Sequence, residues 1–180
     1  MPRITPVTPE TAEGSVKEGY EMFQKRFGII PEPIRMLSVS PELFDIQLAR
    51  SSYFATRSNL SFSLLAHIRY MAARQLDYSF CTDLNRALLE KQGMTEADFK
   101  AMEADPSQSL LEENEGAMLA FVVKAMKAPA SVTNADVDTL REYGWTDRDM
   151  VDAMAQGVSM IDHAIMMQVF DMSPHCLMEN

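Results

Sequence analysis

Apolar residues recur three or four positions apart along almost the whole chain, and no segment sustains the strict alternation that marks a half-buried strand. The first such stripe contains Val16, Tyr20, Phe23 and Phe27. Similar stripes follow up to the last ten residues, which gives an expected total of about eight helices. The sequence therefore predicts an all-α helical bundle that forms a single domain over residues 1–180.

Several expected helix boundaries carry their own signals. Gly28 is typical of a helix end, and Ser40 followed by Pro41 is typical of a helix start. Three later starts place a threonine three residues before an aspartate, which is the spacing of a capping box. These pairs are Thr95 with Asp98, Thr133 with Asp136, and Thr146 with Asp149. Two of them lie in the related segments "GMTEADF" and "GWTDRDM", which predict two helical hairpins.

The last expected helix covers residues 147–170 and is rich in methionine. Its stripe runs through Met150, Met154, Val158, Ile161, Ile165 and Val169. Because Met160, Met166 and Met167 lie off that stripe, the helix is apolar on more than one side. Buried core accounts for one side, and flexible methionines on another suit an interface between subunits. We therefore expect a homo-oligomer.

Composition narrows the possible partners. A formal net charge of -10 leaves no surplus of Lys and Arg to neutralise nucleic-acid phosphates or to bind anionic membranes. No apolar run is long enough to span a bilayer, and the polar, proline-rich start "MPRITPVTPE" has no secretory signal. Two cysteines in 180 residues do not make a disulfide scaffold, so we expect a cytoplasmic, reduced setting.

Three segments taken in order resemble the carboxymuconolactone decarboxylase/alkylhydroperoxidase D (AhpD-like) superfamily. They are "FGIIPEPIRMLSVSPEL", "RYMAARQLDYSFCTDLNRALLEKQGMTEADF" and "GAMLAFVVKAMKAPASVTNADVDTLREYGWTDRDM". The resemblance covers residues from about 27 to about 154, and the methionine-rich helix 147–170 continues it. It implies an all-helical fold that assembles as dimers, trimers or hexamers.

The peroxidase branch of that superfamily implies a Cys-x-x-Cys at a helix start, a histidine four residues after the second cysteine, and an upstream glutamate. Cys81 matches the attacking second cysteine. Tyr78 stands at the position of the resolving cysteine, Asn85 at that of the histidine, and Ala66 near that of the glutamate. The chain thus resembles a divergent member that lacks the complete Cys-x-x-Cys…His site.

Cys81 has two readings. A thiol in the first turn of a helix is close to unpaired N–H groups that favour the thiolate, the form that attacks a peroxide. Asp77 and Asp83 lie nearby in the sequence and oppose a second negative charge, and Asn85 cannot take up a proton at neutral pH. In the other reading Cys81 is simply a buried helix residue.

The same stretch supplies a candidate pocket between helices. We expect His67, Tyr78, Cys81 and Asn85 to line it, with Phe80 as apolar wall. His67 is a candidate acid or base because its pKa ordinarily lies near neutrality, and a hydrogen-bonded structural histidine is the alternative.

The remaining cysteine, Cys176, is either a distant resolving partner for Cys81 or an incidental residue of the C-terminal tail. Together with Asp162, His163 and His175 it matches no recurring zinc spacing. We expect no metal and no cofactor.

Two functions follow from the sequence. The first is a peroxidase-related protein in which Cys81 acts alone as an antioxidant thiol peroxidase and an external thiol resolves its sulfenic acid. The second is a non-peroxidase protein that binds or converts a small organic acid or lactone in the same interhelical pocket, as a carboxymuconolactone decarboxylase-like enzyme does. Both take a small-molecule substrate.

Overall fold

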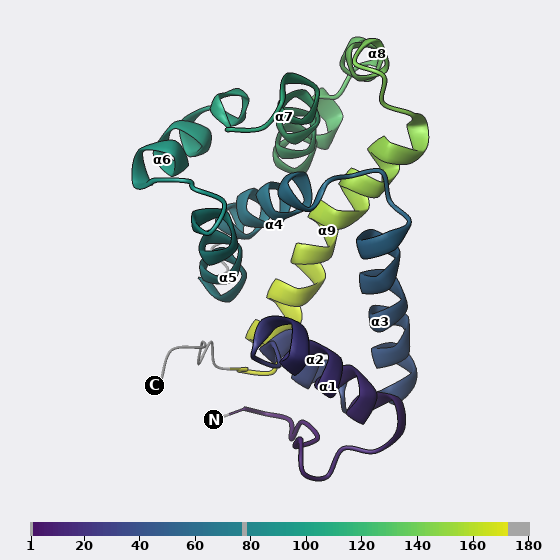
Figure 1. The fold of residues 1–180 in the computed structure, drawn as a ribbon. Coiled ribbons are helices and arrows are strands. Elements are labelled where there is room, and N and C mark those ends of the chain that lie inside the picture. Colours follow the sequence, from purple (N-terminus) through teal and green to yellow (C-terminus); the bar gives the residue numbers. More distant parts are fainter. Residues whose placement is uncertain (1, 77–78, 173–180) are drawn as a thin grey trace. The chain divides into compact units, whose positions relative to one another are not determined.

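The computed structural model describes residues 2–76 and 79–172, apart from the side chain of Phe80, and this part of the chain consists of helices joined by turns and irregular segments (Figure 1). Its elements are α1 (Gly14–Phe27), α2 (Glu32–Leu37), α3 (Pro41–Thr56), α4 (Phe62–Gln75), α5 (Ser79–Glu90), α6 (Glu96–Ala104), α7 (Glu113–Lys127), α8 (Asn134–Glu142) and α9 (Asp147–Val169), with short 3-10 turns at Pro106–Gln108 and Pro129–Ser131. No strand occurs within the described residues, so the predicted all-α class is confirmed.

The described residues form two compact units. The terminal unit contains the residues up to Arg57 together with those from Ile165 onward, and the central unit contains Ser58–Ala164. Helix α9 begins in the central unit and ends in the terminal unit. The expectation of one domain over residues 1–180 stays a prediction.

The terminal unit is held together by the packing of α1 on α3. The ring of Tyr20 meets the ring of Phe44 edge-on, with 6.0 Å between centroids. Gly19 makes room for this contact, because a Cβ at that position would lie 2.6 Å from Cε1 of Phe44. The expected end of α1 is also present, since Gly28 has a φ of 77° and its N–H donates to the carbonyl of Gln24.

The central unit is built around α4. Nine of the fourteen residues of α4 are buried, so this helix has neighbours on more than one side, chiefly α5 and α7. It starts where Ser61 accepts a hydrogen bond from the N–H of Leu64 at 3.0 Å. Gly157 of α9 lies against α7, because a Cβ there would be 2.8 Å from Sδ of Met126 and 3.0 Å from Cγ1 of Val122.

The two predicted hairpin junctions have the same hydrogen bonds. At the end of α5, the N–H groups of Gly93 and Met94 donate to carbonyls of the last helical turn, and the corresponding groups of Gly144 and Trp145 do so at the end of α8. The next helix then starts with a Thr–Asp pair. The carboxylates of Asp98 and Asp149 accept bonds from the N–H and hydroxyl of their threonines, and Asp136 does the same at the start of α8. The prediction of the three Thr–Asp caps is confirmed. At the start of α3, Ser40 occupies the expected position before Pro41, but its side chain makes no capping hydrogen bond.

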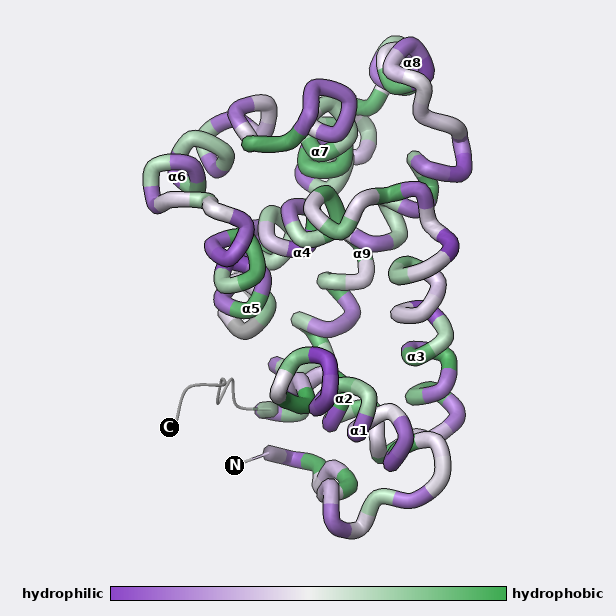
Figure 2. Tube along the Cα trace, viewed as in Figure 1, coloured by the Kyte–Doolittle hydropathy of each residue, from purple (hydrophilic) through white to green (hydrophobic). Residues whose placement is uncertain are grey.

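The stripe predicted for the last helix does not match its buried side. The buried residues of α9 include Met150, Ala153, Met160, Ala164 and Met167. Val151, Val158, Ile165 and Val169 are exposed, so the seven-residue spacing of the first three lies on an outward face. The sequence contained two apolar stripes, and burial separates them; Figure 2 shows that hydrophobic and hydrophilic residues alternate along α9.

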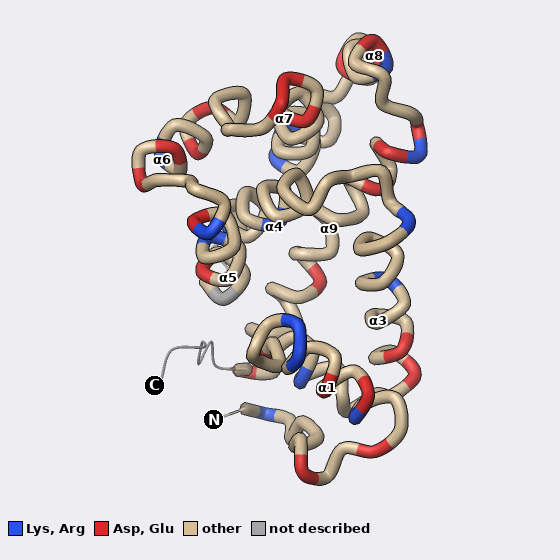
Figure 3. The backbone as a smooth tube through the Cα atoms, in the orientation of Figure 1, with Lys and Arg blue, Asp and Glu red and all other residues tan. Residues whose placement is uncertain are grey.

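Charged residues are spread over the helices of both units, with acidic residues in the majority (Figure 3). Several basic side chains form ion pairs: Arg74 with Glu103 at 3.2 Å and Arg86 with Glu90 at 2.9 Å are examples. Of the helices that the structure describes, none combines the length and the apolar character needed to cross a bilayer.

Candidate functional site

Cys81 lies in the first turn of α5 and is buried, with 6 % of its surface exposed. Its own N–H belongs to the first turn of the helix, where backbone donors have no partner within the helix. These donors and the helix dipole favour a negative charge on the sulfur. Asp83 lies two residues further along the sequence and is expected to disfavour a negative charge on the sulfur; its side chain is exposed.

Asn85 follows one turn later on α5 and is 2 % exposed. Its Nδ2 donates to the carbonyl of Cys81 at 2.8 Å, and its Oδ1 accepts from Nε of Arg69 at 2.8 Å. An amide nitrogen can only donate and a guanidinium can only donate, so the two bonds fix the orientation of the Asn85 amide. Asn85 therefore connects the backbone of Cys81 to a cation on α4.

Arg69 supplies that cation from the half-buried face of α4. Burial lowers the pKa of Arg69 to about 10, and the negative charge of the neighbouring Cys81 thiolate acts in the opposite direction. The guanidinium stays protonated at neutral pH. Because the attraction between two charges is mutual, the same interaction favours the thiolate of Cys81.

The described residues leave the outer edge of the Arg69 guanidinium without a hydrogen-bond acceptor. Its Nε is used by Asn85, whereas neither Nη atom donates to a described residue. No carboxylate of the described residues lies within ion-pair distance of it. This is unlike Arg74 on the same helix, which pairs with Glu103.

His67 occupies a different side of α4. Residues 67 and 69 point about 160° apart on an α-helix, so His67 and Arg69 project to nearly opposite sides. Nδ1 of His67 bonds to the carbonyl of Ser63 at 2.8 Å and must carry the proton, which leaves Nε2 as an acceptor. Nε2 is buried and has no partner among the described residues. Burial lowers the pKa of His67, while the Ser63 carbonyl and the charge of Glu115 on α7 act to raise it.

The expected site residues are thus only partly brought together. Cys81 and Asn85 share one buried turn of α5, and no described contact joins His67 to either of them. Tyr78, His175 and Cys176 lie outside the described residues, and so does the side chain of Phe80. Ala66, at the position of the glutamate, is fully buried.

Sequence reasoning missed Arg69. Arg69 follows Ala66 by three residues and precedes Ala73 by four, so these three residues lie along one face of α4. A single arginine on an otherwise apolar face is a signal that the sequence contains. Its pairing with Asn85, sixteen residues away on another helix, is not a local pattern.

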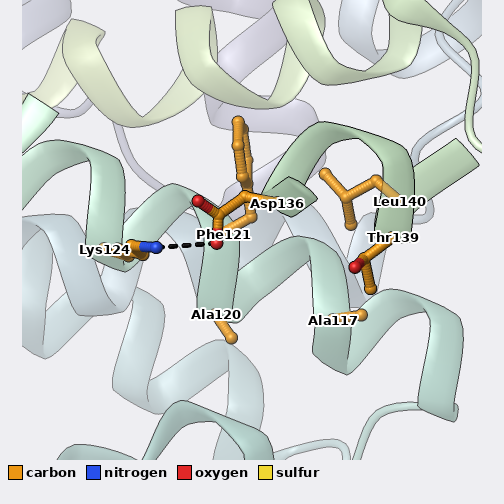
Figure 4. Close-up of a pocket in the computed structure, with 7 residues that line it drawn as sticks. All are labelled: Ala117, Ala120, Phe121, Lys124, Asp136, Thr139 and Leu140. Atoms are coloured by element: carbon orange, nitrogen blue, oxygen red, sulfur yellow. Dashed lines mark hydrogen bonds and ion pairs between the residues drawn. The ribbon is translucent and has the colours of Figure 1, made fainter. Parts of the chain in front are cut away.

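A hollow lies between α7 and α8, and none of the expected site residues lines it. It has a volume of about 250 Å³ and is lined by Ala117, Ala120, Phe121, Lys124, Asp136, Thr139 and Leu140. Figure 4 shows Lys124 reaching to the Asp136 carboxylate, which accepts its hydrogen bond at 2.6 Å. This bond and those from Thr133 lower the pKa of Asp136 to about 2. The polar groups of this hollow satisfy each other, so they stabilise the start of α8.

No protein-family model matches the sequence, and no curated protein matches it. Two solved structures are similar in fold. One is the crystal structure of an alkylhydroperoxidase AhpD core, a peroxidase-related protein from Ralstonia eutropha JMP134, with a TM-score of 0.80 and 20% identity over 97% of this chain and 92% of that chain. The other is a peroxidase-related protein from Silicibacter sp. TM1040, with a TM-score of 0.77 and 19% identity over 97% and 90% of the two chains.

The likeness to these two structures concerns the fold, since both are less than 25% identical to this chain. It supports the resemblance seen in the sequence. The chain has the all-α fold of AhpD-like, peroxidase-related proteins.

Proposed function

We propose that this protein is an AhpD-like, thiol-dependent peroxidase-related oxidoreductase in which Cys81 is the single attacking sulfur. The observation that carries the proposal is the placement of Arg69 beside Cys81, with its guanidinium held by Asn85 at 2.8 Å. The proton-relay residues of the resemblance are replaced by Asn85 and Ala66. A fixed cation stabilises a thiolate without a neighbouring base.

The reaction has two stages. The Cys81 thiolate attacks the terminal oxygen of a hydroperoxide, the O–O bond breaks, and Cys81 becomes a sulfenic acid while the alkoxide leaves and takes a proton from solvent. An external thiol then forms a mixed disulfide with Cys81 and releases water. A second external thiol restores the Cys81 thiol and leaves as the disulfide of the reductant. Cys81 is oxidised in the first stage and reduced in the second.

The test uses a Cys176→Ser parent, in which Cys81 is the remaining cysteine. Stoichiometric hydrogen peroxide is added in the presence of dimedone, and intact mass measures the sulfenate adduct. We expect one adduct per chain, none in the Cys81→Ser variant, and turnover only with added thiol. Absence of the adduct in the parent would refute the proposal and favour the non-peroxidase function. In the native chain, a Cys81–Cys176 disulfide after peroxide treatment would show an internal resolving partner.

His67 is a second candidate participant. Its Nε2 is a buried acceptor without a partner among the described residues, and its lowered pKa keeps it neutral at pH 7. Since it projects away from Arg69, its part in the first stage is structural support of α4. The His67→Gln variant of the Cys176→Ser parent should form the sulfenate adduct at the same rate as the parent. Loss of the adduct in a folded variant would show that His67 takes part in the reaction.

We also infer that the protein is cytoplasmic and assembles with copies of itself. Val151, Val158 and Ile165 are 67%, 44% and 55% exposed and recur every seven residues along α9. This spacing places aliphatic side chains along one seam of a long helix, as in paired helices. A dimer, trimer or hexamer that covers the seam removes this apolar surface from water.

A further inference from the structure

We infer that the Nη edge of Arg69 binds the carboxylate of the substrate, so that the hydroperoxide reduced at Cys81 belongs to an organic acid. This inference rests on the proposed function for the peroxide step, and it adds the class of substrate.

The first support is the unused half of the guanidinium. Nε of Arg69 is fixed by Asn85, which holds the plane of the group, while neither Nη atom donates to a described residue. A planar pair of N–H donors is the geometry that receives the two oxygens of a carboxylate. Asn85 therefore orients the fork without occupying it.

The second support is that the described part of the chain offers Arg69 no carboxylate as counter-charge. Burial of a charged group is costly unless an opposite charge compensates it. The chain has 26 acidic residues against 16 basic ones, yet no described carboxylate lies within ion-pair distance of Arg69. By contrast, Arg35, Arg74 and Arg86 each pair with a glutamate.

The third support comes from the reaction cycle. The Cys81 thiolate compensates Arg69 only while it is reduced and ionised. In the mixed disulfide the sulfur is neutral, and Arg69 then needs an anion from elsewhere. A carboxylate on the Nη edge supplies it. In the hydroperoxide the carboxylate places the O–O bond close to the sulfur, and in the alcohol product it remains as the counter-charge when the sulfur is neutral.

The test measures carboxylate binding without thiol chemistry. Benzoate and its neutral analogue benzamide are titrated by calorimetry into the Cys81→Ser protein at low ionic strength. We expect saturable binding of one benzoate per chain and none of benzamide. The Arg69→Gln change should weaken benzoate binding by about tenfold or more, because the charge-assisted fork is lost. The Arg69→Lys change keeps the charge without the fork and should give an intermediate affinity.

Arg74→Gln is the matched control, since Arg74 lies five residues along the same helix and already pairs with Glu103. It should leave benzoate affinity unchanged. Equal benzoate affinity in the Cys81→Ser protein and its Arg69→Gln form, or no benzoate binding at millimolar concentrations, would overturn the inference.

A second measurement applies if Arg69→Gln fails to fold. In the Cys176→Ser parent, alkylation of Cys81 by iodoacetate is compared with alkylation by neutral iodoacetamide. Benzoate should slow alkylation by iodoacetate and should not slow alkylation by iodoacetamide. Rates of the two reagents that benzoate leaves unchanged would contradict the inference. Sulfenate formation with hydrogen peroxide, which has no carboxylate, tests the proposed function separately, so the two can fail independently.

Discussion

Arg69 and Asn85 join α4 to α5 through one hydrogen bond of 2.8 Å, from Nε of the guanidinium to Oδ1 of the amide. The other end of the amide is bonded to the carbonyl of Cys81. Asn85 thus uses both of its polar atoms inside the protein, and each bond depends on the other for its direction. The position of the cation beside Cys81 follows from this arrangement.

Replacement of Asn85 by alanine tests that relationship. The change leaves Nε of Arg69 without its acceptor and should reduce the free energy of unfolding by about 1–3 kcal/mol. It should also slow iodoacetamide alkylation of Cys81 at pH 7, because the guanidinium is no longer fixed near the sulfur. Asn59→Ala is the control: Asn59 donates to Asp149 at 3.1 Å elsewhere in the central unit, so its loss affects stability and leaves alkylation unchanged. Unchanged alkylation in Asn85→Ala would show that Arg69 needs no such support.

His67 should make the stability of the protein depend on pH. Its pKa in the folded protein is lowered from 6.5, mainly by burial, so below about pH 6.5 the unfolded chain binds a proton that the folded protein does not. Stability should therefore decline as the pH falls from about 6.5 towards the folded pKa, and this part of the decline should be missing in His67→Gln. Urea unfolding at pH 7.5 and at pH 5.5 measures it. Parallel declines in the two proteins would refute the prediction.

The stability that Asp136 contributes should depend on pH in a more acidic range. Its pKa is lowered to about 2 by Lys124 and Thr133, so the stability that it contributes is present above about pH 3.8 and is lost as the pH falls towards 2. Asp136→Asn should lower the melting temperature at pH 7 and remove this part of the acid dependence. Asp138→Asn, on the same helix and 62% exposed as a side chain, is the control and should have a smaller effect. Equal effects of the two changes would contradict the capping role.

Two glycines within helices should differ in their tolerance of alanine. Gly157→Ala should destabilise the protein by about 1–3 kcal/mol, because the added Cβ meets Met126 at 2.8 Å and Val122 at 3.0 Å. Gly116→Ala is the matched change, because a Cβ at position 116 would lie at an ordinary contact distance of 3.6 Å from Oγ of Ser109. This change should stabilise the protein by about 0.5–1 kcal/mol, since alanine has the higher helix propensity. Chemical denaturation gives both values. A neutral Gly157→Ala would mean that Met126 and Val122 move aside freely.

The exposed seam of α9 should control self-association. Val158→Asp places a charge at the middle of the seam and should shift the mass in light scattering towards the monomer at micromolar concentration. Leu110→Asp is the control, because Leu110 is 61% exposed and lies outside α9. A native protein that is already monomeric would contradict the expected oligomer.

Features that depend on neighbouring residues could be predicted from the sequence. Gly28 and the threonine–aspartate pairs have the conformations expected of them, because each signal needs only one turn of helix. The buried side of α9 could not be chosen in advance, since Met160 and Val158 are both apolar and only packing distinguishes them. Likewise, Arg69 belongs to the site because it donates a hydrogen bond to Asn85 on another helix, and no spacing in the sequence predicts that contact.

The two hairpin junctions have a use beyond this fold. In segments 93–99 and 144–150, seven consecutive residues stop one helix, turn the chain and start the next, and the backbone and Thr–Asp hydrogen bonds that do this involve only the adjoining turns. In the second segment, Trp145 also donates to the carbonyl of Asn114, and Asp149 accepts from Asn59. The first segment is therefore the better connector to transplant between two helices of a new scaffold, because the second also relies on partners on other helices.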